Sequence, residues 1–127
     1  MTRYKIIVGY DGSAYAGWQI QPGHPTVQAA LQDALLRLTS ETVIAHGSGR
    51  TDQGVHARQQ VVHVDFERND NLVPLLQKGL NALLPADIRI YRIRRVGAHF
   101  DARRSAIRKE YRYFIWNAAV VPPFLRL

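Results

Sequence analysis

The chain contains no cysteine, which excludes disulfide bonds, thiolate nucleophiles and zinc or iron–sulfur centres built on cysteine. It also lacks a run of about 18 apolar residues, so no segment is predicted to span a membrane. The first residues lead directly into a strand pattern and not into a signal peptide. We therefore expect a cytoplasmic domain with few cofactor options, and 127 residues suffice for one core.

Acidic residues are scarce, because 10 Asp and Glu stand against 17 Lys and Arg and leave a net charge of +7. Residues 89–112 hold nine basic side chains and only two acidic ones, so the excess lies in this stretch. Such a block is typical of a protein that binds a polyanion, although a merely solvated surface has the same composition. Arginine outnumbers lysine, which favours phosphate recognition and base stacking.

Hydrophobic periodicity predicts an α+β domain. Apolar runs or alternating patterns predict strands over residues 3–11, 42–46, 58–66, 88–96 and 107–116. Helical spacing predicts helices over residues 27–39 and 72–84, capped by Thr26 and Asn71. The order β-α-β-β-α-β with one extra strand is the ferredoxin-like pattern, an antiparallel sheet with both helices on one face. Broken alternation at Ile88, Ile90 and Ile93 predicts a β-bulge in the strand over 88–96.

The connection over residues 46–57 is longer than an ordinary hairpin loop and contains three glycines. It also places Arg50 and Asp52 two residues apart. Glycines let a backbone adopt positive φ and approach a ligand closely. From the residues alone, a ligand-binding loop and a flexible polar loop with Asp52 in an Asx-turn stay equal alternatives.

Residues 49–57, with the sequence GRTDQGVHA, resemble the signature of the A-type tRNA pseudouridine synthases. Further segments agree with that family: Tyr10-Asp11-Gly12 with Tyr15, Gly17, Trp18 and Gln19; Thr26-Val27-Gln28; Phe100-Asp101-Ala102-Arg103; Ser105-Ala106; Lys109-Glu110-Tyr111-Arg112-Tyr113; and Pro122-Pro123-Phe124. Gln59 and Arg104 depart from its usual pattern. Family members are roughly twice as long, so the resemblance implies that residues 1–127 form the N-terminal catalytic-loop domain and that the C-terminal half is absent.

The resemblance implies isomerisation of uridine to pseudouridine in the tRNA anticodon stem-loop, without cofactor or metal. It gives Asp52 the role of catalytic carboxylate, Tyr111 that of the active-site tyrosine, and Arg58 that of filling the gap left by an extruded base. Either Arg50 or Arg58 could favour the ionised form of Asp52. The expected residues for substrate and RNA binding are Arg50, Thr51, Gly54, His56, Arg103, Arg104, Arg108 and Lys109.

Several alternatives stay open. His46, His56 and His63 lack the spacing of a metal site, so no metal is expected. Trp18 fits a binding groove or a packing position, and Asp11 fits a second acid or a turn. The partner implied by the family is tRNA, and its members form homodimers, whose interface the absent half would share. The competing functions are a noncatalytic RNA-binding module of the same fold and a small-molecule regulatory domain. Because the family's cleft lies between its two halves, we expect weak or absent activity from this chain alone.

Overall fold

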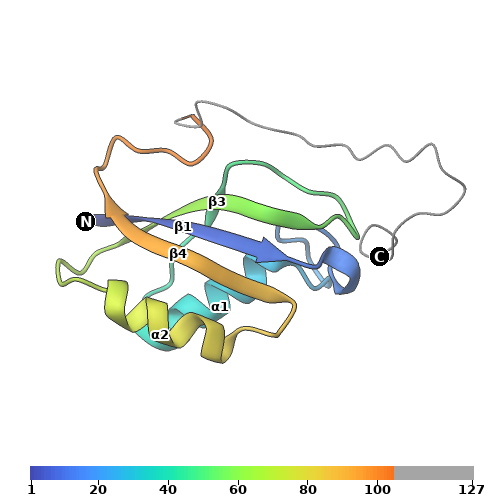
Figure 1. The fold of residues 1–127 in the computed structure, drawn as a ribbon, viewed down its shortest axis with the longest axis horizontal. Helices are drawn as coiled ribbons and strands as arrows, with labels where there is room; N and C mark the ends of the chain where they lie inside the picture. The colour runs from blue at the N-terminus through green and yellow to red at the C-terminus, as the bar shows by residue number, and fades with distance from the viewer. Residues whose placement is uncertain (105–127) are drawn as a thin grey trace, which may run out of the picture.

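The computed structural model describes residues 1–104, in which two helices pack against one face of a four-stranded antiparallel sheet (Figure 1). The strand order is β2-β3-β1-β4, which confirms the ferredoxin-like α+β prediction. The predicted strand over 107–116 lies outside the described residues. Within those residues, no helix is both long and apolar enough to traverse a lipid bilayer. The elements are β1 Thr2–Tyr10, η1 Gly12–Ala14, α1 Val27–Thr39, β2 His46–Gly47, β3 Ala57–Phe66, α2 Val73–Leu83 and β4 Ile88–Val96.

Alternation along β1 separates the two faces of the sheet. Tyr4, Ile6 and Val8 are fully buried in the core between the sheet and the helices. Lys5 and Ile7 point the other way and are only partly buried. We call this second side the open face, because Figure 1 shows both helices on the opposite side of the sheet. Within residues 1–104, no helix covers the second face of the sheet, because successive side chains of a strand point to opposite faces and both helices pack on the first.

Helix α2 begins at Val73, one residue later than predicted, and Leu72 occupies the N-cap position in place of Asn71. The Asn71 side chain accepts a hydrogen bond from the Val73 amide at 3.1 Å. The buried Tyr4 hydroxyl accepts from the Leu72 amide at 3.0 Å and donates to the Asp70 carbonyl at 3.1 Å. The first amides of a helix need hydrogen-bond partners from outside the helix. Asn71 and Tyr4 both supply them here, whereas the sequence predicted Asn71 alone.

The predicted strand over residues 42–46 is wrong except at its last residue, since only His46 and Gly47 pair with β3. Polar side chains of α1 occupy the backbone groups that a strand would use. The Gln32 carbonyl oxygen accepts from the Ala45 amide at 3.0 Å, and the Gln28 amide donates to the Ala45 carbonyl at 2.9 Å. Because the amide and carbonyl of Ala45 have side-chain partners, they need no strand neighbour, and the strand begins only at His46.

The β-bulge predicted in β4 is confirmed and falls at Tyr91. Arg92 pairs with Ile7 and Ile90 pairs with Val8, so Tyr91 is the extra residue opposite β1. A bulge reverses the alternation on its strand. Tyr91 and Arg92 are therefore both exposed, whereas Ile90 is buried.

Candidate active site

The segment over residues 48–56, here called the Asp52 loop, connects β2 to β3 and is bonded to the loop that follows β1. The Trp18 amide donates to the Thr51 carbonyl at 3.1 Å, and the Gly54 amide donates to the Tyr15 carbonyl at 3.3 Å. The Tyr10 hydroxyl lies 2.7 Å from the Thr51 hydroxyl. Hydrogen bonds on both sides of Asp52 thus hold its backbone in one position, as a binding loop requires.

Glycines permit this close packing. A Cβ atom on Gly12 would lie 2.0 Å from the Val55 carbonyl oxygen, which is far inside van der Waals contact. Gly17 has a φ of +114°, and its Cβ would lie 2.6 Å from the Thr51 carbonyl oxygen. Gly54 has a φ of +78° in a turn closed by a 3.1 Å bond from the Val55 amide to the Asp52 carbonyl. That φ is the one that the third residue of a type II turn requires.

Buried aromatic rings support the loop from below. Tyr10 and Trp18 stack with ring centroids 6.3 Å apart, and both are nearly inaccessible to solvent. A Cβ on Gly47 would lie 2.9 Å from the Trp18 ring, so the indole packs directly on β2. Of the two alternatives for Trp18, the structure therefore shows packing. Burial raises the pKa of the Tyr10 hydroxyl, against the effect of its bond to Thr51, so Tyr10 is a neutral phenol at physiological pH.

Asp52 is exposed and borders a hollow of about 400 Å³. Within residues 1–104 its carboxylate forms no hydrogen bond or ion pair, and neither Arg50 nor Arg58 is bonded to it. A fixed backbone with an uncommitted carboxylate suits a group that meets a substrate. The sequence analysis did not predict that Gln21 would line this hollow. The feature that could have indicated it is the loop before α1, which is rich in Gly and Pro and contains Gln21. The hollow is lined by Ala16, Gln19, Gln21, Arg50, Thr51, Asp52 and Gln53.

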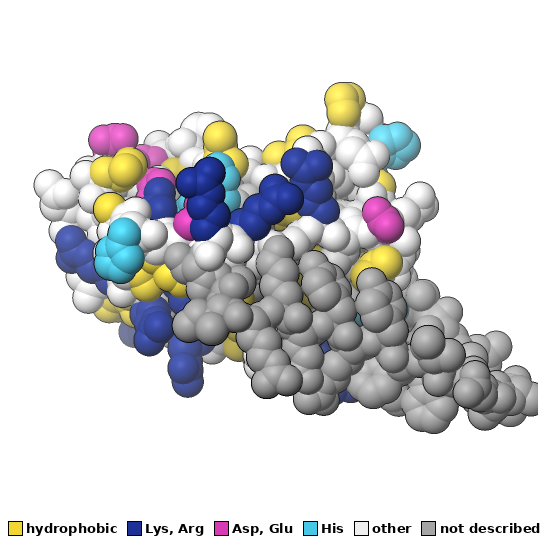
Figure 2. Space-filling model, turned by 90° about the horizontal axis from the view of Figure 1, so that it is seen from above, with side chains coloured by type: hydrophobic (Ala, Val, Ile, Leu, Met, Phe, Trp, Pro, Cys, Tyr) yellow, Lys and Arg dark blue, Asp and Glu magenta, His cyan; other side chains and the backbone are white. Residues whose placement is uncertain are grey.

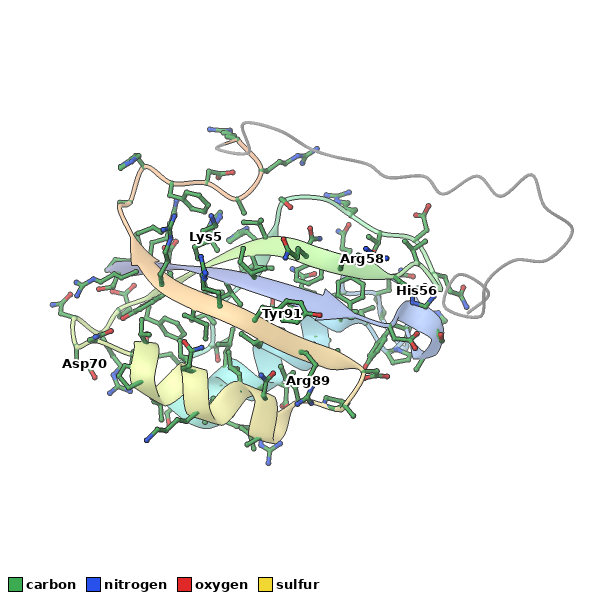
Figure 3. All side chains as sticks on the ribbon, in the orientation of Figure 1. Lys5, His56, Arg58, Asp70, Arg89 and Tyr91 are labelled. Atoms are coloured by element: carbon green, nitrogen blue, oxygen red, sulfur yellow. The ribbon has the colours of Figure 1, made fainter. Side chains whose placement is uncertain are left out.

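Asp11 and His56 order the base of the site. The Asp11 carboxylate accepts from the backbone amide of Ser13 at 2.9 Å and from its hydroxyl, and these bonds lower the pKa of Asp11. Asp11 is therefore a turn residue and not a second acid. Nδ1 of His56 accepts from the Gly12 amide at 3.0 Å. Figure 3 shows His56 and Arg58 near the end of the sheet where β1 finishes. Residues 1–104 contain no group of three metal-ligating side chains.

The remaining predicted RNA-binding residues lie after β4. Arg103 and Arg104 are exposed, and their amides both donate to the Asp101 carboxylate at 2.9 Å. Arg108, Lys109 and Tyr111 lie outside the described residues. Arg89 differs from its neighbours in the basic stretch, because its guanidinium donates to the carbonyls of Asn81, Leu84 and Pro85 at the end of α2. It caps that helix and contributes little to an anion-binding surface.

The segment over residues 97–104 is bonded to the open face by two side chains. The Arg3 guanidinium forms an ion pair with Asp65 at 2.8 Å and also donates to the carbonyls of Ala98 and Phe100. Nδ1 of the buried His63 accepts from the Ala102 amide at 2.9 Å, while its ring stacks on His46 with centroids 4.6 Å apart. His63 can accept this bond only while Nδ1 is unprotonated.

Acidification should therefore release this segment. Burial, with the nearby charges of Arg3 and His46, lowers the pKa of His63, against a weaker opposite effect of Asp101 and Asp65. A histidine with a lowered pKa stabilises the fold above its ordinary pKa, and that contribution is lost as pH falls through the lowered value. His63→Asn keeps an acceptor but cannot titrate. We expect its unfolding free energy, measured by urea titration between pH 7.5 and 5, to fall less than that of the unaltered chain. Equal losses would contradict this role of His63.

The structure is thus a ferredoxin-like α+β domain that carries an exposed carboxylate on a loop held by hydrogen bonds and close glycine contacts. Comparisons with known proteins identify its family. The sequence profile of the tRNA pseudouridine synthases matches residues 6–103. The chain belongs to the tRNA pseudouridine synthase family. It is 47% identical over 128 residues to tRNA pseudouridine synthase A 1 of Protochlamydia amoebophila, covering 100% of this chain and 50% of that protein.

Two further relatives give the same result. The tRNA pseudouridine synthase A of Maridesulfovibrio salexigens is 48% identical over 116 residues, covering 91% of this chain and 42% of that protein. Its counterpart in Listeria monocytogenes is 43% identical over 127 residues, covering 99% of this chain and 51% of that protein. The chain thus spans about half the length of the curated relatives that it matches.

Proposed function

We propose that this chain is the half of a tRNA uridine isomerase that carries the catalytic carboxylate, Asp52, and that its substrate lies in the anticodon stem-loop. The observation that supports the proposal most is the placement of Asp52. Its backbone is bonded on both sides, and its carboxylate borders an open hollow without a partner in the described residues. The family to which the chain belongs supplies the reaction class.

The reaction needs a carboxylate at the sugar. The N1–C1′ bond of uridine breaks, the uracil turns, C5 bonds to C1′, and the proton lost from C5 is balanced by one gained at N1. A carboxylate stabilises or traps the positive sugar that forms between these steps, as it does in glycoside hydrolysis. Because no electron is gained or lost overall, the reaction requires no redox cofactor. The target nucleotide must leave its stack before Asp52 can reach C1′.

The other residues divide by position. Arg50 lies in the hollow with Asp52 and would hold a phosphate or the uracil. Thr51, Gly54 and His56 shape the Asp52 loop through the contacts described above. We assign Arg58 to the space left by the extruded base and Tyr111 to stacking on the uracil. Four residues are proposed to bind tRNA phosphates: Arg103, Arg104, Arg108 and Lys109.

We expect this chain alone to bind tRNA in a salt-sensitive way while isomerising uridine weakly or not at all. Each phosphate contact releases counterions, so affinity should fall steeply between 50 and 200 mM salt. Fluorescence anisotropy with labelled tRNA measures binding, and tritium release from 5-tritiated uridine measures turnover. An affinity that salt leaves unchanged would contradict binding through the basic residues. Rapid turnover by the chain alone, lost in Asp52→Ala, would show that the half-length chain is sufficient.

A further inference from the structure

A second hollow lies on the open face and is separate in its lining from the one that Asp52 borders. Its volume is about 380 Å³, within the range of roughly 300–1,000 Å³ that is usual for ligand sites. Figure 2, which views the molecule from above Figure 1, shows dark blue Lys and Arg side chains on the part of the surface that is not grey. We call it the basic hollow. Its lining consists of Lys5, Ile7, Gln59, Tyr91, Arg92 and Arg94.

No ion pair within residues 1–104 offsets the charges of the basic hollow, and the Lys5 ammonium lies 5.5 Å from the centre of the Phe100 ring. Lys5 pairs directly with Arg94 across β1 and β4, and like charges in that position destabilise a sheet. No carboxylate is among the residues that line the hollow. Arg92 and Arg94 form no ion pair within residues 1–104. Two guanidinium groups and an ammonium group on one surface are suited to a phosphate backbone.

Tyr91 adds an aromatic surface to these charges. The β-bulge turns Tyr91 toward the open face, where 58% of it is exposed. A Cβ on Gly9 would lie 2.6 Å from the Tyr91 ring, so the ring rests against the Gly9 backbone and any larger residue would lift it. An exposed ring supported on one side and flanked by arginines is the arrangement on which single-stranded bases stack.

The position of Tyr91 links the basic hollow to the candidate active site. The same Gly9 Cβ would lie 2.7 Å from both the Tyr91 hydroxyl oxygen and the Arg58 carbonyl oxygen. Arg58 follows the Asp52 loop by two residues. In Figure 3, Tyr91 lies between Lys5 and Arg58 along the sheet. An RNA strand that reaches the Asp52 loop can therefore continue over Tyr91 toward Lys5.

We propose that the basic hollow is a single-stranded RNA subsite, in which Lys5, Arg92 and Arg94 hold phosphate and Tyr91 stacks on an unpaired base. This inference rests on the proposed function, because it takes the RNA to be the strand that contains the target uridine. The subsite would bind nucleotides that flank this uridine and leave the target itself to the Asp52 hollow. Recognition through stacking makes an unpaired strand the preferred ligand over a duplex.

The test compares variants of this chain by anisotropy with a labelled 12-nucleotide oligouridylate and with a fully paired RNA hairpin. Tyr91→Ala should weaken oligouridylate binding roughly tenfold, whereas Tyr91→Phe should retain it. Arg92→Gln with Arg94→Gln should lower the salt slope by about 1.4, since each single-strand contact contributes about 0.7. Hairpin affinity should be insensitive to Tyr91. The matched control is Arg37→Gln with Lys78→Gln, which removes two exposed charges from the helices.

Three results would overturn the subsite: unchanged oligouridylate binding in Tyr91→Ala, an equal change in slope in the helix control, or no RNA binding by the unaltered chain at low salt. The proposed function fails separately. Turnover is measured on a chimera in which residues 1–127 replace the matching half of the Protochlamydia amoebophila protein, because this chain alone is expected to be nearly inactive. Binding that depends on Tyr91, together with chimera turnover that is indifferent to Asp52, would remove the isomerase assignment and leave the subsite. Turnover that depends on Asp52, together with binding indifferent to Tyr91, would do the reverse.

Discussion

Asp52→Asn should reduce kcat/KM for uridine isomerisation on the order of 10⁴-fold, the scale seen when one member of a catalytic unit is removed. The amide keeps the size of the side chain but can neither balance nor trap a positive sugar. Because the chain spans half the length of its relatives, the measurement is best made on a chimera in which residues 1–127 replace the matching half of the Protochlamydia amoebophila protein. Tritium release from 5-tritiated uridine in tRNA gives the rate.

Stability and binding should not follow activity in this variant. Asp52 is exposed and unpaired in the described structure, so its replacement should change the unfolding free energy by at most about 0.5 kcal/mol. Affinity for tRNA should hold or rise, since a negative charge near phosphate is removed. Asp33→Asn, at an exposed position of α1, is the matched control and should retain full activity. If Asp52→Asn isomerised uridine at the rate of this control, another residue would have to be the catalytic carboxylate.

Strong periodicity explains why most of the fold could be predicted from the sequence. In β1 the alternation of Tyr4, Ile6 and Val8 with partly exposed residues matches a sheet covered on one face. The prediction failed at residues 42–45, where the pattern suits a strand but side chains of α1 bind the backbone of Ala45. Whether a backbone group bonds to a glutamine side chain or to a neighbouring strand depends on distances in the folded chain, and hydrophobic periodicity does not report them.

The candidate site could be predicted in part, because residues 49–57 carry a long motif. What the motif does not show is how Asp52 is held. The contact of Gly12 with Val55 joins two loops that are more than 40 residues apart in the sequence, so no local pattern predicts it. Arg89 shows an error in the other direction. It was counted with the arginines that would bind an anion, but its guanidinium donates to carbonyls at the end of α2. A charge count does not distinguish a capping guanidinium from an available one.

Gly12→Ala should lower kcat/KM of the same chimera about 100-fold or more. The new methyl group would lie 2.0 Å from the Val55 carbonyl oxygen and 2.6 Å from its carbonyl carbon, and both atoms belong to the backbone. Neither can be relieved by rotating a side chain, so the Asp52 loop or η1 must move. A displacement of about 1 Å in a positioning element can reduce the rate by about 100-fold. Overpacking of this kind should also lower the unfolding free energy by about 1–3 kcal/mol.

Gly23→Ala is the control that distinguishes displacement of the Asp52 loop from a general loss of fold stability. Gly23 has a φ of +76°, so alanine is strained there, but its Cβ would meet nothing within 4 Å. The substitution should reduce the unfolding free energy by about 1 kcal/mol while leaving Asp52 in place. We therefore expect Gly23→Ala to retain activity at a temperature where both variants are folded, as checked by circular dichroism. Equal activities of the two variants would mean that the contact between Gly12 and Val55 does not position the carboxylate.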